Sequence, residues 1–497
     1  MKAIDPRTSA KLVQKTGLDI GFLCAGWPPD VGGVESHAQD LARALVARGH
    51  RVHVLCLDVS ADGEPFSTHT KDVDGIEVRR MVYAYGDHDR LARVVVNLRA
   101  EEVIQCWLAD TPCDVVHVHH LTGFGMGALR AISASGAPCL MTLHDYWPLC
   151  PRGQMLSAAK SICERPETEA CTNCLNSTWP HLMPSGAGVA SGPRDEPLSD
   201  DGEAVDARTA FALEMLELPD RLFTPSEAAR AVYLKAGLNP DRVAVCENGV
   251  DVDDLAAQVS SARAKAGSDD DASVRLGILG TVLPSKGVLE LARVFVEAQV
   301  PGLKLEVHGN LPSYHGDESY VQELNALGAS HPDLTIHGPY AREELVGILG
   351  GLDGVAAPSR WEEVFGLSVR EARAAGLSVL VSNAGALPDV LRNPNSDTAA
   401  SGQWIVDRDD WNAWAKVLHE FAGNPELRSA GSQGANAPRT SKSMMLQLER
   451  AYVEVIVDST DAMPHLLHSI EGLESKPEPE PRQSGWLGRI FNGFGSR

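Results

Sequence analysis

The stretch 19–57, DIGFLCAGWPPDVGGVESHAQDLARALVARGHRVHVLCL, contains one complete unit of the pattern that decides the fold. It begins with the apolar run 19–25, continues through 33–48, where apolar residues recur at helical spacing, and ends with the apolar run 51–57. Continuous apolar strands are buried on both faces, and a helix between two such strands joins them in parallel. The stretch therefore predicts a β-α-β unit in a parallel sheet that is covered by helices on both faces.

The same alternation recurs in two series that are separated by a change in composition. Further strands of the first series are expected at 114–119, 138–143 and 221–224. The second series contains the expected strands 274–280, 304–308, 334–337, 354–357 and 378–382. The segment between the two series is rich in Ala, Ser and Asp, which is typical of a linker. The sequence thus predicts the α/β class with two doubly wound parallel-sheet domains, and such sheets bind ligands at the carboxyl ends of their strands.

The periodicity and the composition also place the boundaries of these Rossmann-like domains. We expect an N-terminal extension (1–17), a first domain (18–251) with a cysteine-bearing insertion (145–210), a linker (252–273), a second domain (274–440), a helix that crosses back (441–457), and an acidic, proline-rich linker with an amphipathic tail (458–497). Two domains of this size account for most of the 497 residues.

The composition argues against several classes of protein. The 67 acidic and 44 basic side chains give a net charge of −23, which argues against nucleic acid as a partner, because phosphate recognition requires clustered Lys and Arg. No apolar run approaches the roughly 18 residues of a membrane span, and 1–17 lacks the apolar core of a secretory signal. We therefore expect a cytoplasmic protein, whose ten cysteines are too few for a disulfide scaffold.

The segment 358–367, PSRWEEVFGL, carries the strongest chemical pattern. A helix is expected to start at Gly366, and the backbone N–H groups of Gly366 and Leu367 at its N-terminus suit a diphosphate. Glu371, one turn into this helix, is placed to accept hydrogen bonds from ribose hydroxyls, and Glu363 faces the group beyond the phosphates. The alternative is that both acids only stabilise the N-terminus of a helix.

Two turns between a strand and a helix supply further candidates. Lys286 directly precedes the expected helix start at Gly287, where its cation can balance the charge on a leaving phosphate. Gly32 and Gly33 open the helix after the first strand and permit close approach of a ligand to the backbone. For each turn there is an alternative without a ligand: Lys286 could be a solvated lysine, and Gly32 and Gly33 could simply form a tight turn.

Six motifs in this chain together resemble those of the retaining GT-B glycosyltransferases of the group 1 type, of the family 4 kind. The motifs are GGVE (32–35), RGHRVHVL (48–55), TLHD (142–145), ENGVD (247–251), PSKG (284–287) and the pair Glu363-x7-Glu371, in the family's order over about 18–440. The resemblance implies two Rossmann-like domains that face a central cleft, with the acceptor on the first domain and a nucleotide diphosphate-sugar donor mainly on the second.

The resemblance also implies roles for individual residues. The catalytic residues would be Glu363, His144 and Lys286, and the donor-binding residues would be Gly32, Gly33, Lys286, Arg360, Phe365, Gly366, Leu367 and Glu371. Lys286 and the helix amides would bind the diphosphate, Glu371 the ribose, and Glu363 and His144 the donor sugar. From the residues alone, His144 could equally cap a strand.

The chemistry that the family uses follows from the same resemblance. Attack by the acceptor on the face that the leaving group occupies would retain the anomeric configuration, with the leaving phosphate helping to deprotonate the acceptor hydroxyl. No catalytic metal is expected. The expected acceptor is a glycan or a lipid-linked glycan, as in the synthesis of cell-surface polysaccharides and glycoconjugates.

One position departs from the family pattern. The family usually has Arg five residues before the lysine, whereas this chain has Thr281. The change removes a bidentate phosphate ligand, so either another cation such as Arg360 replaces it or donor binding is weak. Two alternatives therefore stay open: an inactive GT-B module that binds a nucleotide-sugar or a partner protein, and a sugar-nucleotide epimerase on the same fold.

The insertion contains a cluster of four cysteines, Cys150, Cys163, Cys171 and Cys174. Four thiols that end in Cys-Thr-Asn-Cys fit a structural zinc site with four thiolate ligands. Free thiols in a loop and a redox disulfide are the alternatives. The run 117–120, HVHH, looks like a metal motif but is more typical of the end of a strand.

The segment 484–497 has two arginines, no acid and an apolar helical face made of Trp486, Leu487, Ile490, Phe491 and Phe494. It could enter the surface of an anionic membrane, or it could be a frayed terminus, since its four glycines disfavour a helix. The first alternative predicts peripheral contact with the inner face of the cytoplasmic membrane.

Overall fold

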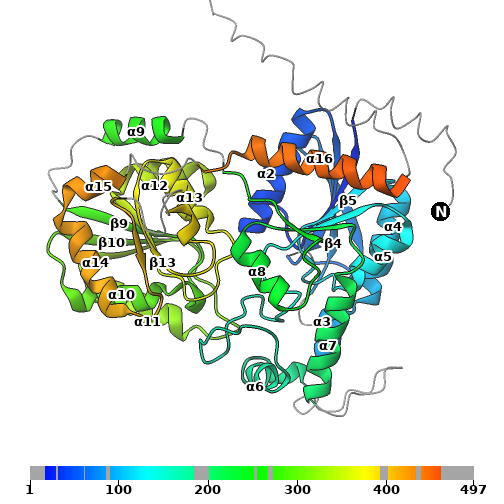
Figure 1. Cartoon of the computed structure of the whole chain (residues 1–497), viewed down its shortest axis with the longest axis horizontal. Helices are drawn as coiled ribbons and strands as arrows, with labels where there is room; N and C mark the ends of the chain where they lie inside the picture. Colours follow the sequence, from blue (N-terminus) through cyan, green and yellow to red (C-terminus); the bar gives the residue numbers. More distant parts are fainter. Residues whose placement is uncertain are drawn as a thin grey trace, which may run out of the picture.

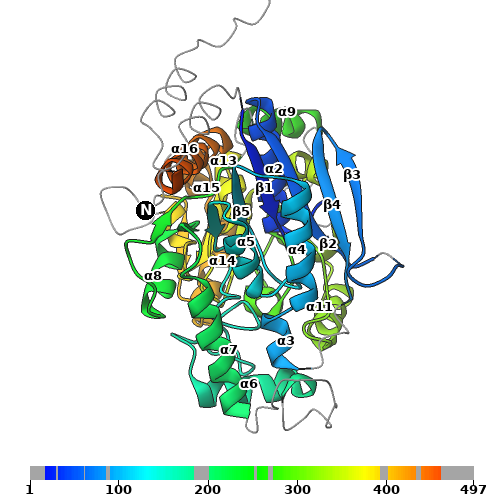
Figure 2. The same cartoon turned by 90° about the vertical axis from the view of Figure 1, so that its right-hand side faces the viewer.

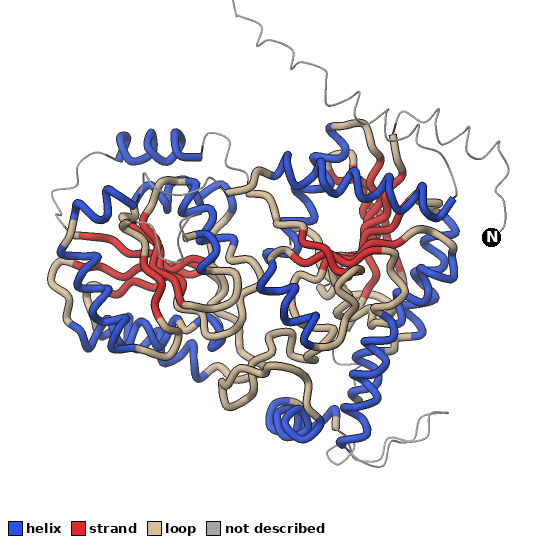
Figure 3. The backbone as a smooth tube through the Cα atoms, in the orientation of Figure 1, coloured by secondary structure: helices blue, strands red, loops and turns tan. Residues whose placement is uncertain are grey.

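The computed structural model describes residues 17–29, 32–60, 62–84, 90–183, 201–250, 255–266, 273–391, 401–431 and 438–460. Two sheets, each flanked by helices, form two domains that lie side by side (Figure 1, Figure 3); in the view turned by 90° the first domain lies in front of the second (Figure 2). The predicted fold class is therefore confirmed. The proposed tail 484–497 and residues 184–200 of the insertion lie outside the described residues. Within the described part, no helix has the length and apolar character needed to cross a bilayer.

The first domain is built on an eight-stranded sheet with the order β3-β4-β2-β1-β5-β6-β7-β8. Its strands are β1 (Asp19–Leu23), β2 (Arg51–Asp58), β3 (Thr68–Val73), β4 (Ile76–Val82), β5 (Val115–Val118), β6 (Cys139–Thr142), β7 (Arg221–Thr224) and β8 (Val243–Val245). Its helices are α2 (Gly33–Ala47), α3 (Leu91–Val95), α4 (Leu98–Asp110), α5 (Gly127–Ser135), α6 (Thr168–Thr178), α7 (Asp201–Met215) and α8 (Glu227–Lys235). Neighbouring strands are parallel except at the edge, where β3 and β4 form an antiparallel hairpin.

The second domain is built on a six-stranded parallel sheet with the order β11-β10-β9-β12-β13-β14. Its strands are β9 (Val274–Leu279), β10 (Leu303–His308), β11 (Leu334–Gly338), β12 (Gly354–Ala357), β13 (Ser378–Ser382) and β14 (Trp404–Val406). Its helices are α9 (Leu255–Ala266), α10 (Val288–Ala298), α11 (Ser319–Ser330), α12 (Leu345–Gly351), α13 (Leu367–Ala374), α14 (Trp411–Gly423) and α15 (Pro425–Gly431).

Burial on both faces explains the continuous apolar strands. Successive residues of a strand point to opposite faces of its sheet. Phe22 accordingly packs in the core beneath α2, whereas Leu23 packs in the core beneath α4 and α5. The segment expected as a linker is partly helical, because Leu255 and Val259 give α9 an apolar side that packs against Leu349 of α12.

The last described helix, α16 (Ser441–Thr460), returns from the second domain and lies across the first domain beside α2 (Figure 1). Its apolar side chains fill the core beneath α2, where Leu448 and Tyr452 are fully buried. The two chain segments that connect the domains are paired at this point, since the amide of Val250 donates to the carbonyl of Arg439 at 2.8 Å. The second domain is therefore joined to the first at two adjacent places.

The strand order positions the site. It reverses direction between β1 and β5 in the first sheet and between β9 and β12 in the second. In doubly wound sheets, ligands bind beyond the carboxyl ends of the strands at such a reversal. The loop after β12 contacts the first domain: the Ser226 hydroxyl donates to the carbonyl of Val364 at 2.7 Å, and the rings of Tyr146 and Trp361 are 5.9 Å apart. The loop at the reversal point of the second sheet thus meets the loops after β6 and β7 of the first domain.

Candidate active site

Lys286 and Glu363, which are 77 residues apart, form a close ion pair between the loops after β9 and β12. The Nζ atom of Lys286 lies 2.6 Å from Oε1 of Glu363 and 5.2 Å from the centre of the Trp361 ring. Gly287 fixes the turn, because its φ is +67° and a Cβ there would lie 2.1 Å from the carbonyl oxygen of Pro358. The sequence predicted both charges but not their contact.

Glu363 is buried, and its surroundings keep it ionised. Burial opposes ionisation, but the Lys286 ammonium and hydrogen bonds from Lys286 and Ser359 outweigh it, so that the pKa of Glu363 lies below its ordinary value. The Ser359 hydroxyl donates to Oε1 at 2.5 Å. A buried carboxylate and an ammonium whose side chain is 32% exposed therefore stand ready for an incoming polar group. The sequence alone did not indicate that Ser359 and Trp361 contact this ion pair.

The helix after Glu363 begins where the sequence placed it. Gly366 is the N-cap of α13 with a φ of +76°, and Leu367 is the first helical residue. The guanidinium of Arg370 stacks on the Phe365 ring, donates to the carbonyl of Phe365, and donates to Oε1 of Glu247 at 3.2 Å. Arg370 is a buried cation beside the start of α13 that the sequence analysis missed.

Glu371 is buried on α13, and it is paired rather than open. Arg342, in the turn η4 (Arg342–Glu344) after β11, donates to Oε1 of Glu371 at 2.5 Å. Burial raises the pKa of Glu371, Arg342 partly reverses this effect, and Asp40 on α2 of the first domain raises it further. Figure 1 shows α13 on the side of the second domain that faces α2 of the first.

Arg360 does not lie free for a phosphate in this structure. Its guanidinium is 3.6 Å from Glu290 and 3.3 Å from Asp409, and its backbone N–H donates to the carbonyl of Ser285. Its expected role as a replacement for the missing arginine at Thr281 therefore requires that it leave two acids. Arg370, in contrast, already lies near the start of α13, where it is hydrogen-bonded to Phe365 and Glu247.

Gly32 and Gly33 lie at the start of α2, on the first-domain side of the boundary. A Cβ on Gly32 would clash with the carboxylate of Glu35, at 2.2 Å from its Oε2. A Cβ on Gly33 would meet no atom within 4 Å, and Gly33 is exposed. Space beside Gly33 is consistent with the predicted close approach of a ligand to this backbone.

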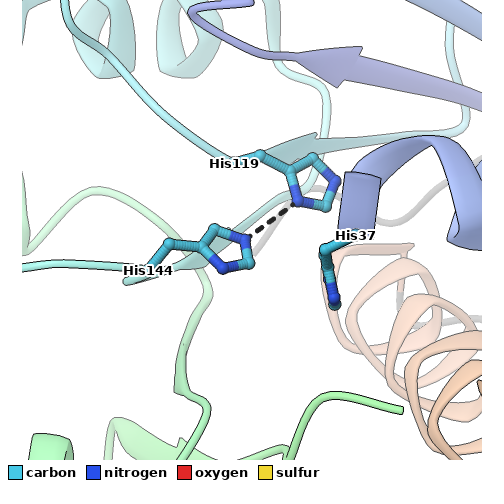
Figure 4. Close-up of side chains that lie close together, drawn as sticks. All are labelled: His37, His119 and His144. Carbon is cyan, nitrogen blue, oxygen red and sulfur yellow. Dashed lines mark hydrogen bonds between the residues drawn. The ribbon is translucent and has the colours of Figure 1, made fainter. Parts of the chain in front are cut away.

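Three histidines of the first domain converge: His37 from α2, and His119 and His144 from the loops after β5 and β6 (Figure 4). Nδ1 of His119 lies 3.3 Å from Nε2 of His144, and the ring centres of His37 and His144 are 4.8 Å apart. The Nε2 atoms of His37 and His119 are buried without a hydrogen-bond partner among the described residues. Only His144 of this trio was a candidate from the sequence.

Burial keeps the three histidines neutral. It lowers the pKa of His37 to about 4 and the pKa values of His119 and His144 well below the ordinary value, and the neighbouring imidazoles add to the effect for the latter two. Neutral imidazoles can each donate one hydrogen bond and accept another. The trio can therefore bind sugar hydroxyls, but it cannot neutralise a phosphate.

The other two histidines of the run 117–120 have partners of their own. His117 lies in β5 and is hydrogen-bonded through Nδ1 to Tyr452 of α16 at 2.7 Å and through Nε2 to Thr142 at 2.8 Å. Nε2 of His120 lies 3.2 Å from Oδ2 of Asp145, and this carboxylate outweighs burial and raises the pKa of His120. Only His119 of the run joins the trio, so the run does not act as one metal motif.

Two groups of described residues place three ligand atoms within 4.8 Å of one another, as a metal ion would require. They are the histidine trio and the set Glu306, His308 and His337 in the second domain. In the second set, Glu306 is already bound by Arg275 at 3.1 Å.

The four cysteines of the insertion come from three short segments that lie near one another. Burial raises the pKa of Cys163 to about 11, and the thiols of Cys150, Cys171 and Cys174 add to the effect. No three of the four sulfur atoms lie within 4.8 Å of one another. All four are free thiols in this structure. Zinc binding by this cluster stays a prediction.

The insertion also reaches the second domain. Arg152 donates through Nη2 to the Tyr314 hydroxyl at 2.7 Å and through Nε to Nε2 of His315 at 3.2 Å. The rings of Trp179 and His315 meet edge to face at 4.9 Å. These contacts join the segment that follows His144 to the loop between β10 and α11, so the insertion connects both sides of the boundary.

Comparison with known families covers most of the chain. Residues 31–185 match the model of Glycosyltransferase Family 4, and residues 261–437 match that of Glycosyl transferases group 1. A D-inositol 3-phosphate glycosyltransferase of a Nocardioides species is 27% identical over 429 residues, covering 82% of this chain and 81% of the relative. The protein of the same name from Mycobacterium marinum is 30% identical over 427 residues, covering 83% and 77%.

Solved structures share the two-domain arrangement. Sucrose-phosphate synthase of Thermosynechococcus elongatus superimposes with a TM-score of 0.63 at 16% identity, over 89% of this chain and 100% of that one. The catalytic domain of starch synthase IV from Arabidopsis thaliana, bound to ADP and acarbose, gives a TM-score of 0.58 at 16% identity, over 88% and 99%. Anabaena HepE in complex with UDP and glucose gives 0.54 at 15% identity, over 92% and 100%.

Proposed function

The chain belongs to the group 1 glycosyltransferases, with a family 4 first domain, and from that premise we propose that it transfers a sugar from a nucleotide diphosphate-sugar to an acceptor hydroxyl with retention of anomeric configuration. The observation that carries the proposal is the ion pair between Lys286 and the buried Glu363, which lies just before the start of α13. A cation and a carboxylate that already neutralise each other can separate to bind a phosphate and a sugar hydroxyl.

The donor would lie across the start of α13. Its diphosphate would accept hydrogen bonds from the first amides of the helix and from Lys286, which exchanges Glu363 for a phosphate oxygen. Glu363, freed on one side, would accept a hydrogen bond from a hydroxyl of the donor sugar. Glu371 would do the same for the ribose, with Arg342 shifting to leave one of its oxygens open. His144, kept neutral by burial, would bind the sugar from the first domain.

In the transfer step, the bond between the anomeric carbon and the phosphate oxygen breaks, and its electron pair stays on the phosphate. The acceptor oxygen forms the new bond on the same face of the sugar, and its proton passes to the departing phosphate oxygen. Lys286 and the amides at Gly366 and Leu367 stabilise the charge that develops there. The protein thus contributes positioning and positive potential, while the leaving group itself serves as the base.

For the acceptor, we propose a phosphorylated polyol. The relatives that match over most of their length are named for D-inositol 3-phosphate. The sequence-based expectation of a glycan or a lipid-linked glycan has no comparable support among these relatives. The similar structures contain UDP in one case and ADP in another, so donors with both bases enter the test below.

A nucleotide-release assay tests the proposal. Purified protein is incubated with UDP-, GDP- and ADP-sugars, with and without inositol phosphates, and the product is examined by NMR for its anomeric configuration. We expect acceptor-dependent nucleotide release with one donor and a product that keeps the donor's configuration. Glu363→Gln should abolish release, whereas Glu323→Gln, an exposed glutamate on α11, should not. An inverted product would refute retention.

A second function, donor binding without transfer, is favoured by Thr281 alone. If a nucleotide-sugar raises the melting temperature of the protein but no acceptor yields product, the chain is a binding module. Conversion of the donor sugar without any acceptor would instead identify an epimerase.

A further inference from the structure

Two arginines beside the cysteine cluster are buried without a carboxylate partner. Arg152 is 7% exposed and Arg208 is 3% exposed. The hydrogen bonds of Arg208 go to two main-chain carbonyls, and those of Arg152 go to a carbonyl, a phenol, an imidazole and a sulfur. Within the described part of the chain, neither guanidinium forms an ion pair with Asp or Glu. Asp145 influences Arg208, but its carboxylate is bound by His120.

Buried cations require a nearby counter-charge, because burial without one is costly. Thiols of the cysteine cluster lie beside both guanidinium cations. Nη1 of Arg152 donates to Sγ of Cys174 at 3.3 Å, and Arg208 donates to the carbonyls of Trp147 and Pro148, in the turn that ends at Cys150. The two cations are therefore placed to stabilise negative charge on these sulfur atoms.

Local structure brings the four sulfurs to this place from three segments. Cys150 closes a turn through its N–H to the carbonyl of Tyr146, at 2.8 Å. Cys163 ends a short hairpin, in which its N–H donates to the carbonyl of Met155 at 2.9 Å. Cys171 and Cys174 lie three residues apart on α6 and so share one face of that helix.

Sγ of Cys174 already has the surroundings of a metal-bound thiolate. It accepts hydrogen bonds from the N–H of Ala158 and from Arg152, both at 3.3 Å. Donors of this kind stabilise the ionised sulfur and orient a ligand in metal sites. A neutral thiol would gain less from two such donors, one of them a cation.

We propose that Cys150, Cys163, Cys171 and Cys174 bind one Zn²⁺ as four thiolates, and that this centre is the counter-charge of Arg152 and Arg208. Binding releases four thiol protons to solvent and forms four Zn–S bonds. The centre keeps two negative charges, which matches the two guanidinium cations. Zn–S bonds are about 2.3 Å long, so the metal would draw the sulfurs closer together than they are in this structure. Disulfides and free thiols are neutral and would leave both arginines without a counter-charge.

The position of the centre gives it a structural consequence. Arg152, which contacts Cys174 on one side, contacts Tyr314 and His315 of the second domain on the other. The metal would therefore fix the insertion, which follows His144 in the sequence and connects the two domains. Removal of the metal should loosen that tie without removing any residue of the donor site.

The first test is the metal content and thiol reactivity of the full-length protein purified under reducing conditions without chelator. We expect about one equivalent of zinc by mass spectrometry. We also expect four thiols that react with an alkylating reagent only after a strong chelator is added. Less than about one-fifth of an equivalent, four thiols reactive from the start, intramolecular disulfides, or iron in place of zinc would each overturn the proposal.

The second test uses variants with matched controls. Cys163→Ser and Cys174→Ser should lose zinc, whereas Cys106→Ser, at an exposed cysteine of α4, should keep it. Arg152→Met should weaken zinc binding about 10- to 100-fold in a chelator competition, and Arg165→Met, at an exposed arginine of the same insertion, should not. If the cysteine variants do not fold, cobalt added to the chelator-treated wild type provides the check, because four thiolate ligands give a tetrahedral visible spectrum. An octahedral cobalt spectrum, or zinc affinity unchanged in Arg152→Met, would overturn the assignment.

Discussion

Replacing Lys286 by Met tests the central pair of the proposed donor site. The substitution keeps most of the side-chain volume and removes the cation that lies 2.6 Å from Glu363. If Lys286 stabilises the leaving phosphate, the loss should fall on the turnover number, because that charge develops fully only in the transition state. Removing one such stabilising group costs about 2.7–4 kcal/mol, or a factor of about 10²–10³ in kcat.

The same substitution should also lower stability, by an amount that follows from burial. Breaking a fully buried ion pair costs about 3–5 kcal/mol, because the remaining charge has no partner. The Lys286 side chain is 32% exposed, so solvent already screens part of the interaction. We therefore expect the free energy of unfolding to fall by about 1–2 kcal/mol. The pKa of Glu363 should rise, since burial would no longer be opposed by the ammonium.

The double variant Lys286→Met, Glu363→Gln separates the two effects. It contains no unpaired charge, so its free energy of unfolding should return to within about 0.5 kcal/mol of the wild type, while its turnover stays low. Urea unfolding gives the stability, and nucleotide release at saturating donor gives kcat. Lys71→Met, at an exposed lysine of β3, is the control. A kcat within about threefold of the wild type for the single variant would refute the role of Lys286.

Three further predictions concern other parts of the structure. Burial lowers the pKa of His37 to about 4 from its ordinary 6.5, so the unfolded state takes up the proton first and stability should be lost as the pH falls from about 6.5 to 4. In urea unfolding, the stability of His37→Asn should depend less on pH than that of the wild type. The same pH dependence in both proteins would contradict the burial of a neutral ring. Glu371→Gln should weaken binding of the donor nucleotide about tenfold or more in calorimetry, since it removes a charged hydrogen-bond acceptor; unchanged affinity would exclude contact with the ribose. Tyr452→Phe removes the 2.7 Å hydrogen bond to His117 and should cost about 1–3 kcal/mol of stability in urea unfolding without changing kcat. A clear fall in kcat would mean that α16 contributes to the active site.

The repeating units of the fold are readable from the sequence because each depends on local pattern. The runs expected at 19–25, 33–48 and 51–57 correspond to β1, α2 and β2 within a few residues. The hairpin of β3 and β4 was missed because β3, with the sequence THTKDV, is almost wholly exposed and has no apolar face to detect. Helix α9 was taken for a linker because its apolar side chains other than Leu255 and Val259 are alanines, although these two suffice to pack it against α12.

The relative positions of the candidate site residues were predictable only where one segment carries them. Glu363, Gly366 and Glu371 lie within nine residues of one another, so their spacing along a turn and a helix could be read directly. Pairs that depend on the tertiary fold could not be found this way. Arg342 and Glu371 are 29 residues apart, and nothing in the sequence around Arg342 indicates that it meets a carboxylate.

The histidine trio shows the same limit. His37 lies on the helix that follows β1, and His119 and His144 follow β5 and β6, so the three are neighbours only because β1, β5 and β6 are adjacent in the sheet. The strand order therefore had to be known before their convergence could be predicted. Burial, which decides that they are neutral, is likewise a property of the assembled domain.

The return of α16 to the first domain has a consequence for the order in which the protein is made. Leu448 and Tyr452 complete the core beneath α2, yet a ribosome adds them after the whole second domain. When the chain has been synthesised up to residue 250, its first domain would have an exposed apolar face beneath α2. That face would stay exposed until about 200 further residues were synthesised. At roughly 5–20 residues per second, this interval lasts tens of seconds or less. We expect the first domain to mature last although it is synthesised first, and we expect the interval to be a point at which chaperones act on this chain.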